Sequence, residues 1–172
     1  MATNSSLRIL SEKIVGEKVK ISSLNTVLNE INNTRKISTS IFNTAEEGVG
    51  HFLVITQLDK ANVLLFDPLS SLMTREVIGI PLTKIFNGVY FNHEKIQDDK
   101  SEFCALFCLG FVRHLLKERS TSSYFEMFNK IDLVHNDRVI CEYLMSEILC
   151  LKNEKVNQKE RECNLRPQQY CS

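Results

Sequence analysis

Several residue types and sequence features are rare or missing in this chain. It contains no tryptophan, and only three prolines and six glycines occur among its 172 residues. We find no internal repeat, low-complexity tract or linker rich in proline or glycine, which argues against a repeat protein or a chain of tethered domains. No run approaches the roughly 18 consecutive apolar residues of a membrane-spanning helix.

The sequence also lacks the features of a secreted protein. The N-terminus, Met-Ala-Thr-Asn-Ser-Ser, has no basic segment followed by an apolar run, so it does not resemble a signal peptide. Six cysteines are present, but all lie in the second half of the chain, whereas small disulfide-stabilised proteins carry them more densely. We therefore expect an intracellular protein with reduced thiols and no membrane association.

Size and charge are those of an ordinary globular protein. Hydrophobic residues make up 43% and charged residues 24%, which predicts one domain over residues 1–172 with a sizeable core. The 21 Lys and Arg balance the 21 Asp and Glu. The net charge of zero therefore gives no indication of nucleic-acid binding.

Apolar periodicity predicts both helices and strands, hence a mixed α+β fold. Helices are predicted over 5–15, from a cap at Ser22 or Ser23 to about 31, and over 101–118, about 122–131 and about 137–152. Strands are predicted in a hairpin over 51–67 that turns at 59–61, and at about 76–80. The polar segment from about 154 to 172 is expected to be a flexible tail.

The predicted hairpin brings two polar residues together. If Leu58 pairs with Asn62, Asp67 at the end of the second strand lies opposite Leu53. His51 at the start of the first strand is then two positions away, at the same end of the hairpin. A side chain that reaches along the strand allows Asp67 to accept the imidazole N–H of His51.

Cys104 has the surroundings of a nucleophile. It follows Ser101, a good N-cap residue, by three positions and precedes an apolar run, so we expect it in the first turn of a buried helix. The helix dipole there favours a thiolate. His51 is the candidate base, Asp67 the residue that orients it, and Gln97, seven positions before Cys104, the candidate oxyanion donor with the Cys104 N–H.

These four residues occur in a recognisable order. Three short segments carry the pattern: Gly-His-Phe at 50–52, Leu-Phe-Asp-Pro-Leu at 65–69 and Cys-Ala-Leu-Phe-Cys at 104–108. Together they resemble the adenovirus protease (adenain) family of cysteine proteases, whose broader relatives are the proteases of ubiquitin-like proteins. The resemblance covers roughly residues 48 to 116. It implies a small central sheet packed between helices, with the catalytic cysteine at a helix N-terminus.

The sequence departs from that family at three positions. Phe52 follows the histidine where family members usually have tryptophan. Asp67 stands where the adenovirus enzymes have glutamate, although the ubiquitin-like-protein proteases use aspartate. Ala105 follows the nucleophile where glycine is usual, and this bears on the oxyanion hole if close backbone approach is needed there.

Each candidate also has a simpler interpretation. His51 and Asp67 are residues that often begin and end strands, and Cys104 resembles an ordinary core cysteine. Cys108, one helical turn further on, is expected in the core. Two sets of residues could be considered as metal ligands: Cys104 and Cys108 with His114, or Cys141 and Cys150 with His135. Neither set has the second half of a structural zinc site, so we expect no metal.

The leading hypothesis is a cysteine endopeptidase that cleaves protein precursors through an acyl-enzyme. The resemblance implies capsid or core proteins of a virus or virus-like element as substrates, the host nucleus or cytoplasm and the virion as location, and an activating peptide or DNA as partners. One alternative is a protease for the tails of ubiquitin-like proteins. Another is an inactive relative that serves as a virion or binding module.

Overall fold

The computed structural model describes residues 4–16, 19–45 and 50–164. Its strands are β1 (Lys20–Ser23), β2 (Ser40–Asn43), β3 (Phe52–Gln57), β4 (Asn62–Phe66) and β5 (Gly88–Phe91). Its helices are α1 (Asn4–Ile14), α2 (Leu24–Thr34), α3 (Leu72–Thr74), the π-helix η2 (Arg75–Gly79), α4 (Ile80–Thr83), α5 (Cys104–Glu118), α6 (Ser122–Glu126) and α7 (Asn136–Asn164). Within these ranges no helix combines the length and the apolar character needed to span a membrane.

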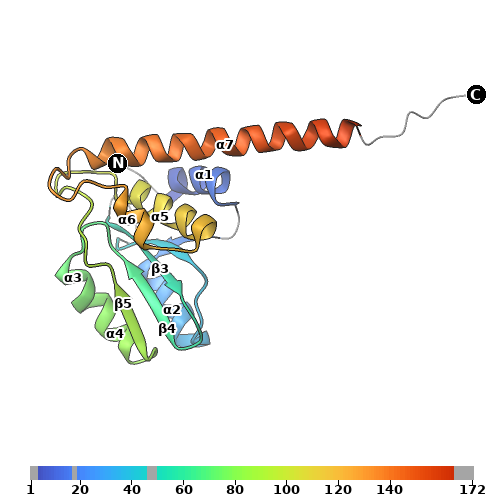
Figure 1. Ribbon diagram of the computed structural model, residues 1–172. Helices are drawn as coiled ribbons and strands as arrows, with labels where there is room; N and C mark the ends of the chain where they lie inside the picture. Colours follow the sequence, from blue (N-terminus) through green and yellow to red (C-terminus); the bar gives the residue numbers. More distant parts are fainter. Residues whose placement is uncertain (1–3, 17–18, 46–49, 165–172) are drawn as a thin grey trace, which may run out of the picture.

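The strands form one mixed sheet with helices on both faces (Figure 1). They follow one another across the sheet in the order β1 to β5. The outer pairs, β1 with β2 and β4 with β5, are parallel, and the two inner pairings are antiparallel. This arrangement confirms the predicted α+β class.

Alternate residues of the central hairpin enter two separate cores. In β3, Phe52 and Val54 belong to the core that α1, α5, α6 and α7 cover. Leu53 and Ile55 belong to the core beneath α2, η2 and α4. Because side chains alternate along a strand, a strand with both faces buried reads as the continuous apolar run Phe-Leu-Val-Ile.

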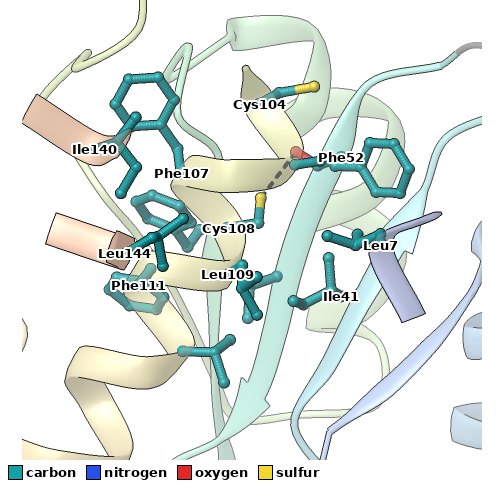
Figure 2. Packing of buried hydrophobic residues seen from close by; sticks show 14 of the residues in the cluster. Leu7, Ile41, Phe52, Cys104, Phe107, Cys108, Leu109, Phe111, Ile140 and Leu144 are labelled. Carbon is teal, nitrogen blue, oxygen red and sulfur yellow. Dashed lines mark hydrogen bonds between the residues drawn. The ribbon is translucent and has the colours of Figure 1, made fainter. Parts of the chain in front are cut away.

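The larger core holds α5 in place along most of its length (Figure 2). The ring of Phe66 on β4 stacks on Phe111 of α5, with ring centroids 4.1 Å apart. The hydroxyl of Tyr124 on α6 donates to the carbonyl oxygen of Phe107 on α5 at 2.7 Å. The first turn of α5, which begins with Cys104, is therefore fixed relative to the hairpin.

The predicted strand at 76–80 is wrong, because this segment is helical. Its β-branched residues suggested a strand, yet the buried side chains Thr74, Ile78 and Leu82 recur every four residues, which is a helical spacing. Pro81 has no N–H to continue the hydrogen-bond ladder, and the wider π-helical turn lies just before it.

Several predicted helix ends also differ from the structure. The helix predicted at 101 begins at Cys104, where Phe103 is the N-cap residue, so Ser101 does not cap it. The helix predicted over about 122–131 ends at Glu126. The last helix was predicted to end near 152, but α7 continues to Asn164 and runs past the rest of the molecule (Figure 1). Residues 165–172 of the expected flexible tail lie outside the described residues.

Candidate active site

The hairpin brings His51 and Asp67 together as its register predicts. Leu58 N–H donates to Asn62 O at 2.9 Å. The antiparallel pairing of β3 with β4 places Val54 opposite Phe66, and the next residue pair in this register is Leu53 with Asp67. His51 lies directly before β3 and Asp67 directly after β4. The imidazole Nε2 of His51 is 2.7 Å from Oδ1 of Asp67, so the two side chains form a hydrogen-bonded pair.

The carboxylate of Asp67 is buried and accepts hydrogen bonds at both oxygens. Besides His51, Oδ1 accepts the N–H of Leu69 at 2.9 Å, while Oδ2 accepts the N–H of Ser71 at 3.0 Å and the hydroxyl of Thr74 at 2.7 Å. Burial by itself raises the pKa of Asp67, but the bonds to His51, Thr74 and Ser71 and the charge of His51 outweigh it and hold that pKa below its usual range. Asp67 is therefore ionised at neutral pH.

His51 hydrogen-bonds Asp67, and Cys104 is the second group that affects its pKa. Burial, the largest single effect, lowers the pKa of His51, but hydrogen bonds to Asp67 and Cys104 and the charges of both partners raise it to about 9. Because Nε2 faces Asp67, Nδ1 is the ring nitrogen left for the Cys104 thiol. A protonated imidazole beside a cysteine is an arrangement that favours a reactive thiolate.

Cys104 and Cys108 lie one helical turn apart but have different environments (Figure 2). Cys104 is the first residue of α5, and an α-helix leaves its first N–H groups without acceptors inside the helix. Cys108 is fully buried, and its thiol donates to the carbonyl oxygen of Phe52 at 3.1 Å. Burial, then the charges of Cys104 and Asp67, raise the pKa of Cys108 well above its ordinary value. Cys108 is a core residue, as predicted.

Gln97 is buried in the loop that leads to α5. Its side-chain Nε2 donates to the carbonyl oxygen of Ser101 at 2.8 Å, and its backbone N–H donates to Pro68 O at 3.1 Å. The first bond uses one of the two amide hydrogens and ties Gln97 to the segment just before Cys104. The assignment of Gln97 as an oxyanion donor stays a prediction.

Two residues around Asp67 had no signal in the sequence. Thr74 donates its hydroxyl to Asp67 Oδ2, and the side chain of Asn92 bonds both backbone polar groups of Asp67. Thr74 resembles any helix residue, and Asn92 any polar residue after a strand. Their bonds connect positions 7 and 25 residues apart, which spacing alone does not indicate.

The two sets of cysteines and histidines considered as metal ligands do not come together. His114 Nε2 pairs with Ser123 Oγ at 2.7 Å, and Cys108 is bonded to the backbone of β3. His135 has Arg138 as its neighbour. Within the described ranges, no group of three or more His, Cys, Asp and Glu side chains is arranged to hold a metal ion.

Comparisons with known proteins add only remote structural similarities. No protein-family model matches the sequence, and no curated protein matches it. The chain is similar to ChlaDub1 from Chlamydia trachomatis at 14% identity and a TM-score of 0.44, over 74% of this chain and 55% of that one. It is similar to the central domain of the Lpg1148 protein from Legionella pneumophila at 16% identity and a TM-score of 0.44, over 78% and 86% of the two chains.

A third similar structure is a de-sumoylating protease, at 16% identity and a TM-score of 0.40, over 91% of this chain and 82% of that one. At such identities and TM-scores, these similarities carry no argument about activity or substrate. None of the three named structures is an adenovirus protease, so the resemblance to that family stays a prediction from the sequence segments. The chain spans little more than half the length of ChlaDub1.

Proposed function

We propose that this chain is a cysteine peptidase in which Cys104, His51 and Asp67 form the catalytic triad. One observation carries the proposal: the His51 imidazole hydrogen-bonds the buried carboxylate of Asp67, and Cys104 contributes with Asp67 to the raised pKa of that imidazole. Cysteine nucleophiles need such a base and such an orienting group. A histidine that merely begins a strand is not expected to interact with both a buried aspartate and a cysteine at a helix N-terminus.

The proposed reaction proceeds through an acyl-enzyme. The Cys104 thiolate attacks the carbonyl carbon of the scissile bond, and the carbonyl π electrons move to the oxygen. The His51 imidazolium then gives its proton to the leaving nitrogen as the C–N bond breaks. In the second half, His51 takes a proton from water, the resulting hydroxide attacks the thioester, and Cys104 leaves as thiolate.

The N-terminal end of α5 supports stabilisation of the oxyanion. The N–H groups of Cys104 and Ala105 have no acceptor within the helix, so they are the candidate backbone donors. The Ala105 side chain is fully buried. We infer that its methyl group lies in the core rather than over the reacting carbonyl, so alanine at this position is compatible with the proposed site.

Two substrate classes follow from the sequence resemblance, and both are proteins. A ubiquitin-like protein that carries a reporter on its C-terminal tail is the first to assay, since the proteases of ubiquitin-like proteins use aspartate at the position of Asp67, whereas the adenovirus enzymes have glutamate. A viral structural precursor is the second. The narrower assignment to virion maturation has no support beyond the sequence segments.

The test is cleavage of both substrate types by the wild-type chain and by Cys104→Ala and His51→Ala. We expect release of the C-terminal product by wild type, and a loss of at least about 10³-fold in kcat/KM in each variant, with unchanged circular dichroism. Cleavage by Cys104→Ala at the wild-type rate would exclude the triad. A wild-type chain that binds a substrate without cleaving it would identify the inactive binding module instead.

A further inference from the structure

Asn92 lies beside Asp67 at the point where two neighbouring strands end. β4 and β5 are parallel, with Leu65 opposite Phe91. Asp67 is the first residue after β4, and Asn92 is the first residue after β5. The register therefore brings these two residues to the same end of the sheet.

At this end of the sheet, the Asn92 side chain makes the hydrogen bonds to the Asp67 backbone that a neighbouring strand would otherwise make. Its Oδ1 accepts the N–H of Asp67 at 2.8 Å, and its Nδ2 donates to the carbonyl oxygen of Asp67 at 2.7 Å. Nδ2 also donates to the carbonyl oxygen of Glu94 at 2.9 Å. One carboxamide thus pairs with both backbone polar groups of the proposed catalytic acid, whose carbonyl oxygen also accepts the N–H of Ser70 at 2.9 Å, and Asn92 itself is only 8% exposed.

We propose that Asn92 is a positioning residue that fixes the main chain of Asp67, so that the carboxylate meets His51 Nε2 in one orientation. This proposal rests on the proposed peptidase function. The Asp67 side chain is short, so a displacement of its backbone moves the carboxylate by a similar amount. A hydrogen bond of 2.7 Å between His51 and Asp67 has little room for such a displacement.

The alternative is that Asn92 contributes only to stability. Removing its carboxamide leaves the N–H of Asp67 without its partner, although the carbonyl oxygen still accepts the N–H of Ser70, and losing a buried bond destabilises a protein wherever it occurs. A change in stability or in total activity therefore cannot distinguish the two roles. The test needs a readout at His51 and a control that loses equivalent bonds elsewhere.

Asn136, at the start of α7, provides that control. It is fully buried, and its Oδ1 accepts the N–H of Asn129 at 2.8 Å. Its Nδ2 donates to the carbonyl oxygens of Asn129 and Ile96, both at 2.8 Å. Asn136 therefore makes the same three kinds of bond as Asn92, but to backbone groups outside the proposed triad.

The experiment compares Asn92→Ala with Asn136→Ala in the full chain by NMR titration of the His51 ring. The wild-type pKa of His51 is about 9. We expect it to fall by roughly one pH unit in Asn92→Ala and to stay unchanged in Asn136→Ala, although both variants lose comparable stability. With a cleavable substrate, Asn92→Ala should also lower kcat about 10-fold and leave KM within about twofold.

If Asn92→Ala does not fold, Asn92→Ser is the second variant. Its hydroxyl can pair with one backbone group of Asp67. A His51 pKa that is the same in the Asn92 variants as in wild type would overturn the proposal. So would failure of both variants to fold while Asn136→Ala folds, because Asn92 would then be needed for the fold itself. Since the titration needs no substrate, it tests Asn92 even if the wild-type chain shows no peptidase activity.

Discussion

At the residue scale, individual hydrogen bonds determine the ionisation state of Asp67. Its carboxylate accepts bonds from His51, Leu69, Ser71 and Thr74, two at each oxygen. The N–H groups of Leu69 and Ser71 belong to the turn after β4, and Thr74 lies in the short helix α3 that follows. The segment that was predicted as a strand at 76–80 is thus the continuation of the helix whose first turn supports the acid.

The hydroxyl of Thr74 can be removed at nearly constant side-chain shape. Thr74→Val eliminates the bond to Asp67 Oδ2, whereas Thr74→Ser keeps a hydroxyl at that position. We expect Thr74→Val to lower kcat about 10-fold and to raise the pKa of Asp67, since a donor to its charged form is lost. Steady-state kinetics of both variants checks this. Equal rates for the valine and serine variants would show that the hydroxyl is not needed.

The raised pKa of His51 predicts how stability depends on pH. The value of about 9 in the folded protein lies above the ordinary 6.5, so folding favours the protonated ring. The resulting stabilisation is fully present below about pH 6.5 and is lost as the pH rises to about 9; it is of order 1–3 kcal/mol. Urea unfolding at the two ends of this range should show that the free energy of unfolding decreases less with rising pH in His51→Gln than in wild type. An equal decrease in the two proteins would contradict the assigned pKa.

The sequence predicted the three residues of the proposed triad, but it did not indicate the residues that support them. The hairpin register follows from one short turn, so His51 and Asp67 could be paired before the structure was known. The apolar run after Cys104 predicted the helix, although not the residue that caps it. Asn92 and Thr74 act through bonds between side chains and distant groups, which depend on the three-dimensional path of the chain.

At the scale of elements, burial decided which segments could be predicted. β3 and β4 are apolar enough to be recognised, but β1 and β2 have only four residues each and include lysine, serine and asparagine. β2 is a strand because it pairs with β3 of the hairpin, and β1 because it pairs with β2, and not because of their own propensity. The end of α7 was missed for a related reason. The Lys, Glu and Gln of its last turns suggested a polar tail, but they are also good helix formers.

A buried carboxylate joins α5 to α7. Glu147 accepts hydrogen bonds from Arg113 at 2.8 Å and Lys117 at 3.0 Å. Burial raises the pKa of Glu147, but the bonds to both cations outweigh it and lower that pKa below 4.5. The resulting stabilisation is present above about pH 4.5 and is lost as the pH falls through the lowered value.

Glu147→Gln should therefore reduce the free energy of unfolding by about 1–3 kcal/mol at neutral pH and by less in acid. Glu142→Gln is the matched control, because this carboxylate lies on the same helix in an exposed pair with Arg138 at 3.6 Å. Its effect should stay within about 0.5 kcal/mol. Equal losses in the two variants, measured by urea unfolding, would show that the contact between α5 and α7 does not depend on Glu147.

On the scale of the whole molecule, the candidate site exists only when the sheet and α5 are packed together. His51 and Asp67 come from the hairpin, and Cys104 comes from a helix that the larger core holds against it. We expect any enhanced reactivity of Cys104 to disappear over the same range of urea concentration as the far-ultraviolet circular dichroism signal. If the enhanced reactivity of Cys104 were lost at clearly lower urea concentrations than the circular dichroism signal, the site would open before the core unfolds.

The central claim is that His51 activates Cys104, and the alkylation rate of Cys104 tests it most directly. Iodoacetamide labelling at about pH 6.5, followed by peptide mass spectrometry, compares Cys104 with Cys150, an exposed free cysteine of the same chain. We predict that Cys104 reacts at least about 10-fold faster than Cys150 in wild type, and that His51→Ala removes this advantage while Cys150 is unaffected. A Cys104 rate equal to or below that of Cys150, or one unchanged by His51→Ala, would contradict the assignment of Cys104 as an activated nucleophile.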